Sequence, residues 1–250
     1  MTVVYGILML AALGGMIFCS KRQKTNPAMQ PIAFVLLVVV CVAGFFLMKD
    51  MGVFGSSSNS LLSNEMKFYA SQGYKAGKVL SQNHAGKKVL VITDPGFDTN
   101  ENIKGLIDQV KAGFGSDNVV VDTIALPGNQ GDSPMPLFMM MKAKDFDAVV
   151  EKYKDAQVII STIGLPSDAG AMKFWKMKER PALFLIGMPA GGIAGLPSAL
   201  ANGEISGIII SSPNAKYDVS APADMEKAFD IRYVVVDKSN FDQYKQYFGN

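Results

Sequence analysis

Three aspartates stand at places in the sequence where carboxylates could do chemistry. Asp94 and Asp98 follow the apolar run KVLVIT, and Asp168 comes shortly after the apolar run VIISTI. Paired carboxylates hold cations or exchange protons. Asp and Asn side chains near helix starts also accept hydrogen bonds from backbone N–H groups, so capping is the alternative. The single histidine, His84, excludes most schemes that depend on imidazole.

Two further motifs are weak signals for catalysis. The glycine-rich Gly187–Gly195 suits either a phosphate at a helix N-terminus or a tight turn against a sheet. It matches neither of the common nucleotide-binding fingerprints. Ser211 and Ser212 follow a strand, but the GxSxG elbow and a suitable histidine are missing, which argues against a serine hydrolase. We therefore expect no catalytic residue, no cofactor and no metal, and predict that the protein is not an enzyme.

The elements that position these residues alternate between apolar runs and amphipathic stretches. Five of six expected strands are continuous apolar runs rich in β-branched residues, which is typical of a parallel sheet covered on both faces. Helices between them predict an α/β fold with a doubly wound, mostly parallel sheet. The expected strands are Lys88–Thr93, Val119–Ala125, Val158–Ile163, Ala182–Ile186, Ile205–Ser211 and Ile231–Asp237. The expected helices are Glu65–Gln82, one capped by Thr99 or Asn100 and ending near Ala112, Phe146–Tyr153, Ala169–Lys178, Pro197–Ala201 and Asn240–Phe248.

In such sheets, ligands bind beyond the carboxyl ends of the strands. The loops expected at those ends carry small and polar residues. If the protein binds a solute, we expect the pocket to be formed by Asp94, Asp98, Asn100, Gly164, Asp168 and Asn214.

The run FMMM after a long Pro/Gly loop is a candidate for a partner surface. Methionine adapts to irregular surfaces, although packing in the core is the alternative. The expected interaction residues are Pro136, Phe138, Met139 and Met140.

The first fifty residues hold two long apolar segments, Thr2–Cys19 and Ile32–Met48. Each is about long enough to cross a bilayer. Lys21, Arg22 and Lys24 lie between them, and positive loops stay in the cytoplasm. This predicts a transmembrane hairpin with the large domain on the extracytoplasmic, periplasmic side. A cleaved leader is the alternative for the first segment, but it lacks a positive n-region.

The chain thus divides into three expected parts. Residues 1–50 form the hairpin with its short basic loop, residues 51–64 form a flexible Gly/Ser tether, and residues 65–250 form the extracytoplasmic α/β domain. The net charge of +2 gives no case for nucleic acid as a partner. Cys19 and Cys41 both lie in apolar stretches, which excludes a disulfide framework in the domain.

Several segments together show a family resemblance. YASQGYKAGKVLSQNHAGKKVLVITD resembles the inter-lobe helix and following strand of type 1 periplasmic sugar-binding proteins, and ENIKGLIDQVKAGFG looks like their next helix. ALANGEISGIIISSPNAKYD and IRYVVVDKSNFDQYKQYF are similar to later segments near the hinge and the end. The resemblance covers roughly residues 63–250. It implies one lobe of a fold that has two lobes around a sugar, so this chain carries half of such a cleft.

Two main functions follow from these features. The first is a non-catalytic, membrane-anchored scaffold or accessory subunit, which would contact membrane lipid and assemble with itself or with a larger membrane complex. The alternative is a membrane-tethered solute-binding or sensory protein with a small-molecule site at the strand carboxyl ends. An enzyme that uses the three aspartates is the remaining hypothesis.

Overall fold

The computed structural model describes residues 2–22, 29–50, 56–126, 137–187 and 195–248 of the chain. The chain divides into two compact units, Met1–Asn64 and Glu65–Asn250, which are described separately.

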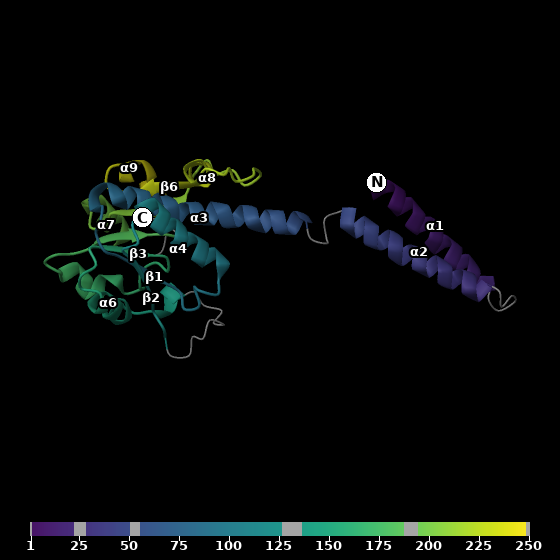
Figure 1. The fold of residues 1–250 in the computed structure, drawn as a ribbon, viewed down its shortest axis with the longest axis horizontal. Coiled ribbons are helices and arrows are strands. Elements are labelled where there is room, and N and C mark those ends of the chain that lie inside the picture. The colour runs from purple at the N-terminus through teal and green to yellow at the C-terminus, as the bar shows by residue number, and fades with distance from the viewer. Residues whose placement is uncertain (1, 23–28, 51–55, 127–136, 188–194, 249–250) are drawn as a thin grey trace. The chain divides into compact units, whose positions relative to one another are not determined.

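Helices α1 (Thr2–Arg22) and α2 (Met29–Asp50) of the first unit pack antiparallel (Figure 1). The ring of Tyr5 stacks on Phe46 with centroids 5.7 Å apart, and Gly15 faces Leu36. Within the described part of the chain, one helix is long and apolar enough to cross a membrane, over Met29–Met48. Only 6% of that stretch is buried, so it is not the core helix of a globular domain. A crossing by α1 stays a prediction.

The long helix α3 (Ser56–His84) begins before the expected start at Glu65. Residues 56–64 were expected to belong to a flexible tether, and the structure has them helical instead. Serine and asparagine, which suggested a linker, also occur in the first turns of helices. The expected tether residues 51–55 lie outside the described part of the chain.

The second unit is built on one six-stranded sheet with the order β2-β1-β3-β4-β5-β6. The first five strands in sequence are parallel, and β6 pairs antiparallel with β5. The doubly wound, mostly parallel sheet is therefore confirmed. The strands are β1 (Val89–Thr93), β2 (Val119–Thr123), β3 (Val158–Ser161), β4 (Ala182–Leu185), β5 (Gly207–Ser211) and β6 (Tyr233–Val236).

The apolar side chains of alternate strand residues belong to two buried layers, one on each face of the sheet. Figure 1 shows the helices that surround these strands. Val89 and Val91 pack with α3 and α4 (Glu101–Phe114). Leu90 and Ile92 point to the opposite layer, which is covered by the remaining crossover segments and the chain end. Those segments are α5 (Leu137–Met140), α6 (Ala143–Lys152), η1 (Ala169–Ala171), η2 (Lys173–Lys176), α7 (Leu196–Asn202), α9 (Phe241–Tyr244) and η3 (Lys245–Phe248).

Glycines let α3 and α4 approach to backbone contact. A Cβ atom on Gly73 would lie 2.1 Å from the carbonyl oxygen of Leu106, and one on Gly77 would lie 2.4 Å from that of Val110. Gly113 of α4 meets the carbonyl of Tyr74 in the same way, at 2.1 Å. Because a side chain does not fit at these positions, the three glycines fix where α3 crosses the sheet face.

Two crossover segments differ from expectation. The helix predicted over Ala169–Lys178 is wrong: Met172 is extended with ψ 134° between η1 and η2. The Asp147 carboxylate accepts hydrogen bonds from the N–H groups of Lys173 and Phe174, which holds this broken conformation. The sequence reasoning also missed α8 (Met225–Arg232), which starts at the cap Asp224.

The other end of α8 fastens α3 to the sheet. Arg232 is 2% exposed and directs both terminal nitrogens at the Glu65 carboxylate, with Nη2 2.7 Å from Oε1. Its guanidinium lies 3.5 Å from the ring centre of Phe68, and Nε donates to the carbonyl of Lys216 at 3.2 Å. The pKa of Glu65 is lowered, chiefly by its hydrogen bond with Arg232.

Candidate functional site

The sheet reverses its winding direction between β1 and β3, because β2 lies on one side of β1 and all later strands lie on the other. Ile92 pairs with Ser161, so the next residues, Thr93 and Thr162, meet at the carboxyl ends of the two strands. The hydroxyl of Thr162 donates to that of Thr93 at 2.8 Å. In open α/β sheets this switch point is where ligands bind.

Asp94 follows Thr93 directly and is half-buried. Desolvation raises the pKa of its carboxyl group. The described residues offer this carboxylate neither a hydrogen bond nor an ion pair. A partly desolvated carboxylate without a donor is unfavourable in the free protein and gains free energy when a ligand supplies one.

Two tyrosines approach the same edge. Burial raises the pKa of Tyr69 on α3, and the charge of Asp94 raises it further. Burial also raises the pKa of Tyr233. Tyr233 opens β6 opposite Ser211, so the antiparallel strand brings it to the edge where the parallel strands end. Thr93, Thr162, Asp94 and Tyr69, here called the edge cluster, thus combine a carboxylate with three hydroxyl groups.

Of the six residues expected to form the pocket, two are occupied by capping. Asn100 accepts from the N–H groups of Asn102 and Ile103 at 3.0 and 3.3 Å and caps α4, which confirms it as a helix cap. Asp168 accepts from the N–H of Ala143 at 2.8 Å at the start of α6. The capping interpretation therefore applies to both side chains.

Of the other four, Asp94 belongs to the edge cluster, and Gly164, Asp98 and Asn214 differ in their distance from it. Gly164 is buried just beyond β3 with φ 76°, and its carbonyl accepts from the Ser161 hydroxyl at 2.6 Å. Asp98 is exposed in the turn after Asp94. Asn214 follows β5, three strands from β1, which corresponds to about 14 Å at the usual strand spacing. A single small solute at the switch point does not extend that far.

The expected interaction surface is only partly described. Pro136 lies outside the described residues, as do 188–194 of the glycine-rich run and the side chain of Phe138. Met139 is 51% exposed, whereas Met141 is fully buried in the core. The surface interpretation therefore suits Met139, and the core interpretation suits Met141.

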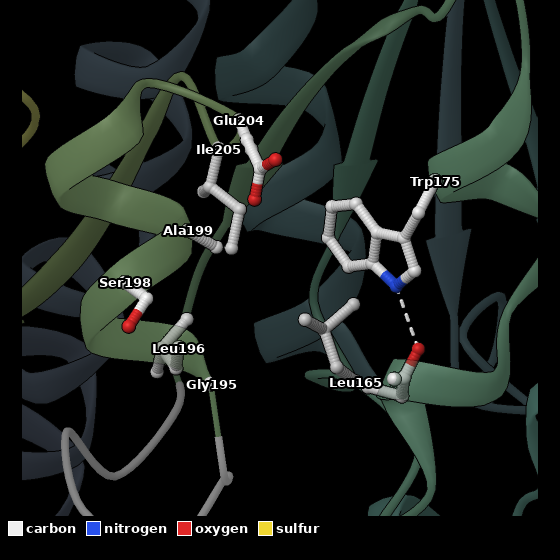
Figure 2. Close-up of a pocket in the computed structure, with 10 residues that line it drawn as sticks. Leu165, Trp175, Gly195, Leu196, Ser198, Ala199, Glu204 and Ile205 are labelled. Carbon is white, nitrogen blue, oxygen red and sulfur yellow. Dashed lines mark hydrogen bonds between the residues drawn. The ribbon is translucent and has the colours of Figure 1, made fainter.

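A separate cavity of about 280 Å³ lies on the sheet face that α7 covers, between α7 and the segment from Leu165 to Trp175. Figure 2 shows the Trp175 indole on one wall and Glu204 and Ile205 opposite it. The indole Nε1 donates to the carbonyl of Ala169 at 2.6 Å, which fixes the ring. Sequence reasoning missed both the edge threonines and this cavity.

In the described part of the chain, no group of three or more His, Cys, Asp or Glu side chains is arranged to hold a metal ion. Cys19 is buried and Cys41 exposed, both as free thiols.

The fold and its edge cluster define a doubly wound α/β domain with a polar switch point. No family model and no curated protein matches the sequence. Among solved structures, a carbohydrate transporter from Acidothermus cellulolyticus in complex with myo-inositol is 13% identical, with a TM-score of 0.46 over 71% of this chain and 60% of that one. GanP, a glucose-galactose binding protein from Geobacillus stearothermophilus, is 15% identical, with a TM-score of 0.43 over 70% and 61%.

An ABC transporter periplasmic solute binding protein from Actinobacillus succinogenes with bound D-allose is 17% identical, with a TM-score of 0.44 over 70% of this chain and 62% of that one. The chain thus spans less than two thirds of the length of these structures. At such values the likeness decides neither the ligand nor the partners of this chain, and the fold rests on its own sheet order and register.

Proposed function

We propose that the protein is a non-catalytic, membrane-anchored binding protein whose α/β domain holds a small hydroxyl-bearing solute at the edge cluster. The observation that carries this proposal is the half-buried Asp94 carboxylate, for which the described residues provide no donor, beside the hydrogen-bonded hydroxyls of Thr93 and Thr162.

The chemistry of the cluster favours a ligand with hydroxyl groups. Asp94 accepts a hydrogen bond from a solute O–H, and a charged acceptor makes such a bond stronger than a neutral one. The half-buried Thr162 hydroxyl both donates and accepts, so it can exchange its present partner for the solute, whereas the fully buried Thr93 hydroxyl positions Thr162. An anionic solute would instead be repelled by Asp94.

The anchor in this proposal is α2, with α1 as the second arm of a hairpin. Exposed apolar side chains such as Ile7, Leu10, Phe34 and Val35 suit contact with lipid. Lys21 and Arg22 end α1 and, with Lys24, mark the cytoplasmic side. The binding domain is then extracytoplasmic, where it meets solutes before they reach the membrane.

A thermal-shift screen tests the proposal. The full chain is reconstituted in phosphatidylcholine vesicles and heated with monosaccharides, inositol, nucleosides or amino acids. A ligand of the native state raises the melting temperature by mass action. We expect a shift with at least one hydroxyl-rich compound and its loss in Asp94→Asn, while Asp98→Asn, an exposed neighbour, keeps it. No shift with any compound contradicts the proposal.

Self-assembly is a second candidate function, favoured by the exposed Met139 on α5. Native mass analysis of the detergent-solubilised chain distinguishes it, because an assembly role requires more than a lone monomer. We expect Met139→Glu to weaken that assembly, since a charge in an apolar contact loses its hydration.

A further inference from the structure

The cavity in Figure 2 is separate from the edge cluster and has a different chemistry. Its described walls are almost entirely apolar: Leu165, Ala169, Leu196, Ala199 and Ile205 are each at most 8% exposed. Their apolar atoms face a hollow of about 280 Å³, close to the lower limit of about 300 Å³ for typical ligand pockets. It therefore admits a small apolar body such as one aromatic ring.

The polar lining is restricted to one side chain that faces inward. In Figure 2 the carboxylate of Glu204 points toward the ring of Trp175, whereas the hydroxyl of Ser198 points away from it. The indole N–H is already satisfied by Ala169. The described residues provide no hydrogen-bond or ion-pair partner for the Glu204 carboxylate. Glu204 is exposed, so water solvates its carboxylate, and an ammonium group can approach it at the mouth of the hollow.

This combination selects a cation. An indole face attracts an ammonium group through its quadrupole, and a nearby carboxylate adds charge–charge attraction. Arg180 lies 5.6 Å from the Trp175 ring centre, but it does not line the cavity, and no ion pair joins it to Glu204. A polyhydroxylated solute fits poorly here, because one carboxylate satisfies few of its hydroxyls and buried unpaired hydroxyls are costly.

We infer that this cavity binds a hydrophobic amine, a compound with a single ammonium group on a small apolar body. The apolar body packs between Trp175, Leu165 and Ile205, and the ammonium group lies at Glu204. Binding at this place does not depend on the edge cluster, so a protein that fails to bind a hydroxylated solute can still bind the amine.

The single tryptophan of the chain reports on this cavity directly. The full chain in phosphatidylcholine vesicles is titrated with 2-phenylethylammonium and with its neutral analogue 2-phenylethanol while Trp175 fluorescence is followed. We expect a saturable change with both compounds and about tenfold tighter binding of the amine, which corresponds to about 1.4 kcal/mol. Glucose is expected to leave the fluorescence unchanged.

Three variants locate the site. Glu204→Gln should lower the affinity for the amine to that for the alcohol. Glu179 is an exposed glutamate away from the cavity, so Glu179→Gln should keep the tenfold difference between the two affinities. Gly170→Met should weaken the binding of both compounds, because Gly170 lines the cavity and a new Cβ there meets no atom, so a long side chain has room at the cavity mouth. Circular dichroism confirms that the variants are folded.

Equal affinities of amine and alcohol in the wild-type protein would overturn the cation assignment. The absence of any saturable change, or an unchanged amine affinity in the folded Gly170→Met variant, would overturn the site itself. Because the readout is Trp175 and the variants leave Asp94 untouched, these outcomes are distinguishable from failure of the solute screen.

Discussion

Arg232 and Glu65 are 167 residues apart in sequence, yet the guanidinium of one directs two nitrogens at the carboxylate of the other. The arginine is buried, while the glutamate side chain is 56% exposed. The pair therefore holds the first half of α3 against the end of α8, and the ring of Phe68 stacks on the guanidinium.

Removal of either partner should destabilise the domain by different amounts. Glu65→Gln is expected to cost about 1 kcal/mol, because the carboxylate is largely solvated. Arg232→Ala is expected to cost about 3 kcal/mol, because it also removes a buried side chain and its ring contact. Denaturant unfolding measures both. Lys245→Ala removes an exposed ion pair with Asp242 and should leave the midpoint unchanged.

The same pair sets a pH dependence. The pKa of Glu65 is lower in the folded protein than its ordinary value of 4.5, so the folded state binds this proton less tightly. The stabilisation is complete above that ordinary value and is lost as pH falls through the folded pKa. The difference in unfolding free energy between wild type and Glu65→Gln should shrink below pH 4.5. A difference independent of pH contradicts an ionic contact.

Asp94 should behave in the opposite direction. Its pKa is raised above 3.8 by desolvation, so its ionisation at neutral pH opposes folding. Asp94→Asn should therefore stabilise the domain above the folded pKa, and this gain should vanish as pH falls to 3.8. Melting temperatures across a pH series measure it. Higher stability together with lost solute binding is the pattern of a residue kept for function. A destabilised variant would show that Asp94 has a structural partner.

The glycines between α3 and α4 should tolerate no side chain. Gly77→Ala and Gly113→Ala are each expected to cost about 3 kcal/mol, because the new Cβ would overlap backbone atoms of the other helix. Gly105→Ala on α4 is the matched control: its Cβ meets nothing, so relief of the helical glycine should stabilise by about 0.5–1 kcal/mol. If the urea midpoints of all three variants changed in the same direction relative to wild type, the close approach of the two helices would be contradicted.

Asn100 is expected to act on stability alone. Asn100→Ala removes the two capping hydrogen bonds of α4 and should cost about 1 kcal/mol. Any solute that shifts the melting temperature of the wild type should shift that of this variant equally. If the ligand no longer raised the melting temperature of Asn100→Ala, Asn100 would be shown to contribute to ligand binding.

The membrane orientation depends on a few charges. Replacement of Lys21, Arg22 and Lys24 by glutamate should reverse the hairpin, because the positive side stays in the cytoplasm. Protease added to spheroplasts should digest the α/β domain of the wild type and spare that of the variant. Release of the wild-type protein from the membrane fraction by alkaline carbonate would contradict the anchor.

The strands of the sheet could be predicted from the sequence because they are short apolar runs, such as VLVIT and VIIS, between turn residues. Only part of the edge cluster could be predicted from the sequence. Asp94 and Gly164 stand beside obvious turns, but the contact between Thr93 and Thr162 depends on the register of two strands 69 residues apart. No local pattern specifies that register.

Two other features were missed for related reasons. The helix α8 has a short apolar stretch around Ala228 and Phe229, and its cap Asp224 gave the only local signal. The region around Trp175 has a helical pattern of apolar residues, but the distant Asp147 carboxylate captures its N–H groups and breaks the helix. In both places contacts between distant segments determine the conformation, and periodicity alone does not contain them.

The antiparallel strand β6 also constrains the order in which the domain can be made. Every partner of β6 lies on β5, and residues 233–236 leave the ribosome after the other five strands. Until then the outer hydrogen-bonding edge of β5 is open, Tyr233 is absent from the carboxyl edge and Arg232 has not reached Glu65. During synthesis the domain therefore passes through a stage in which its central strands are complete and one side of the sheet still exposes unpaired backbone groups.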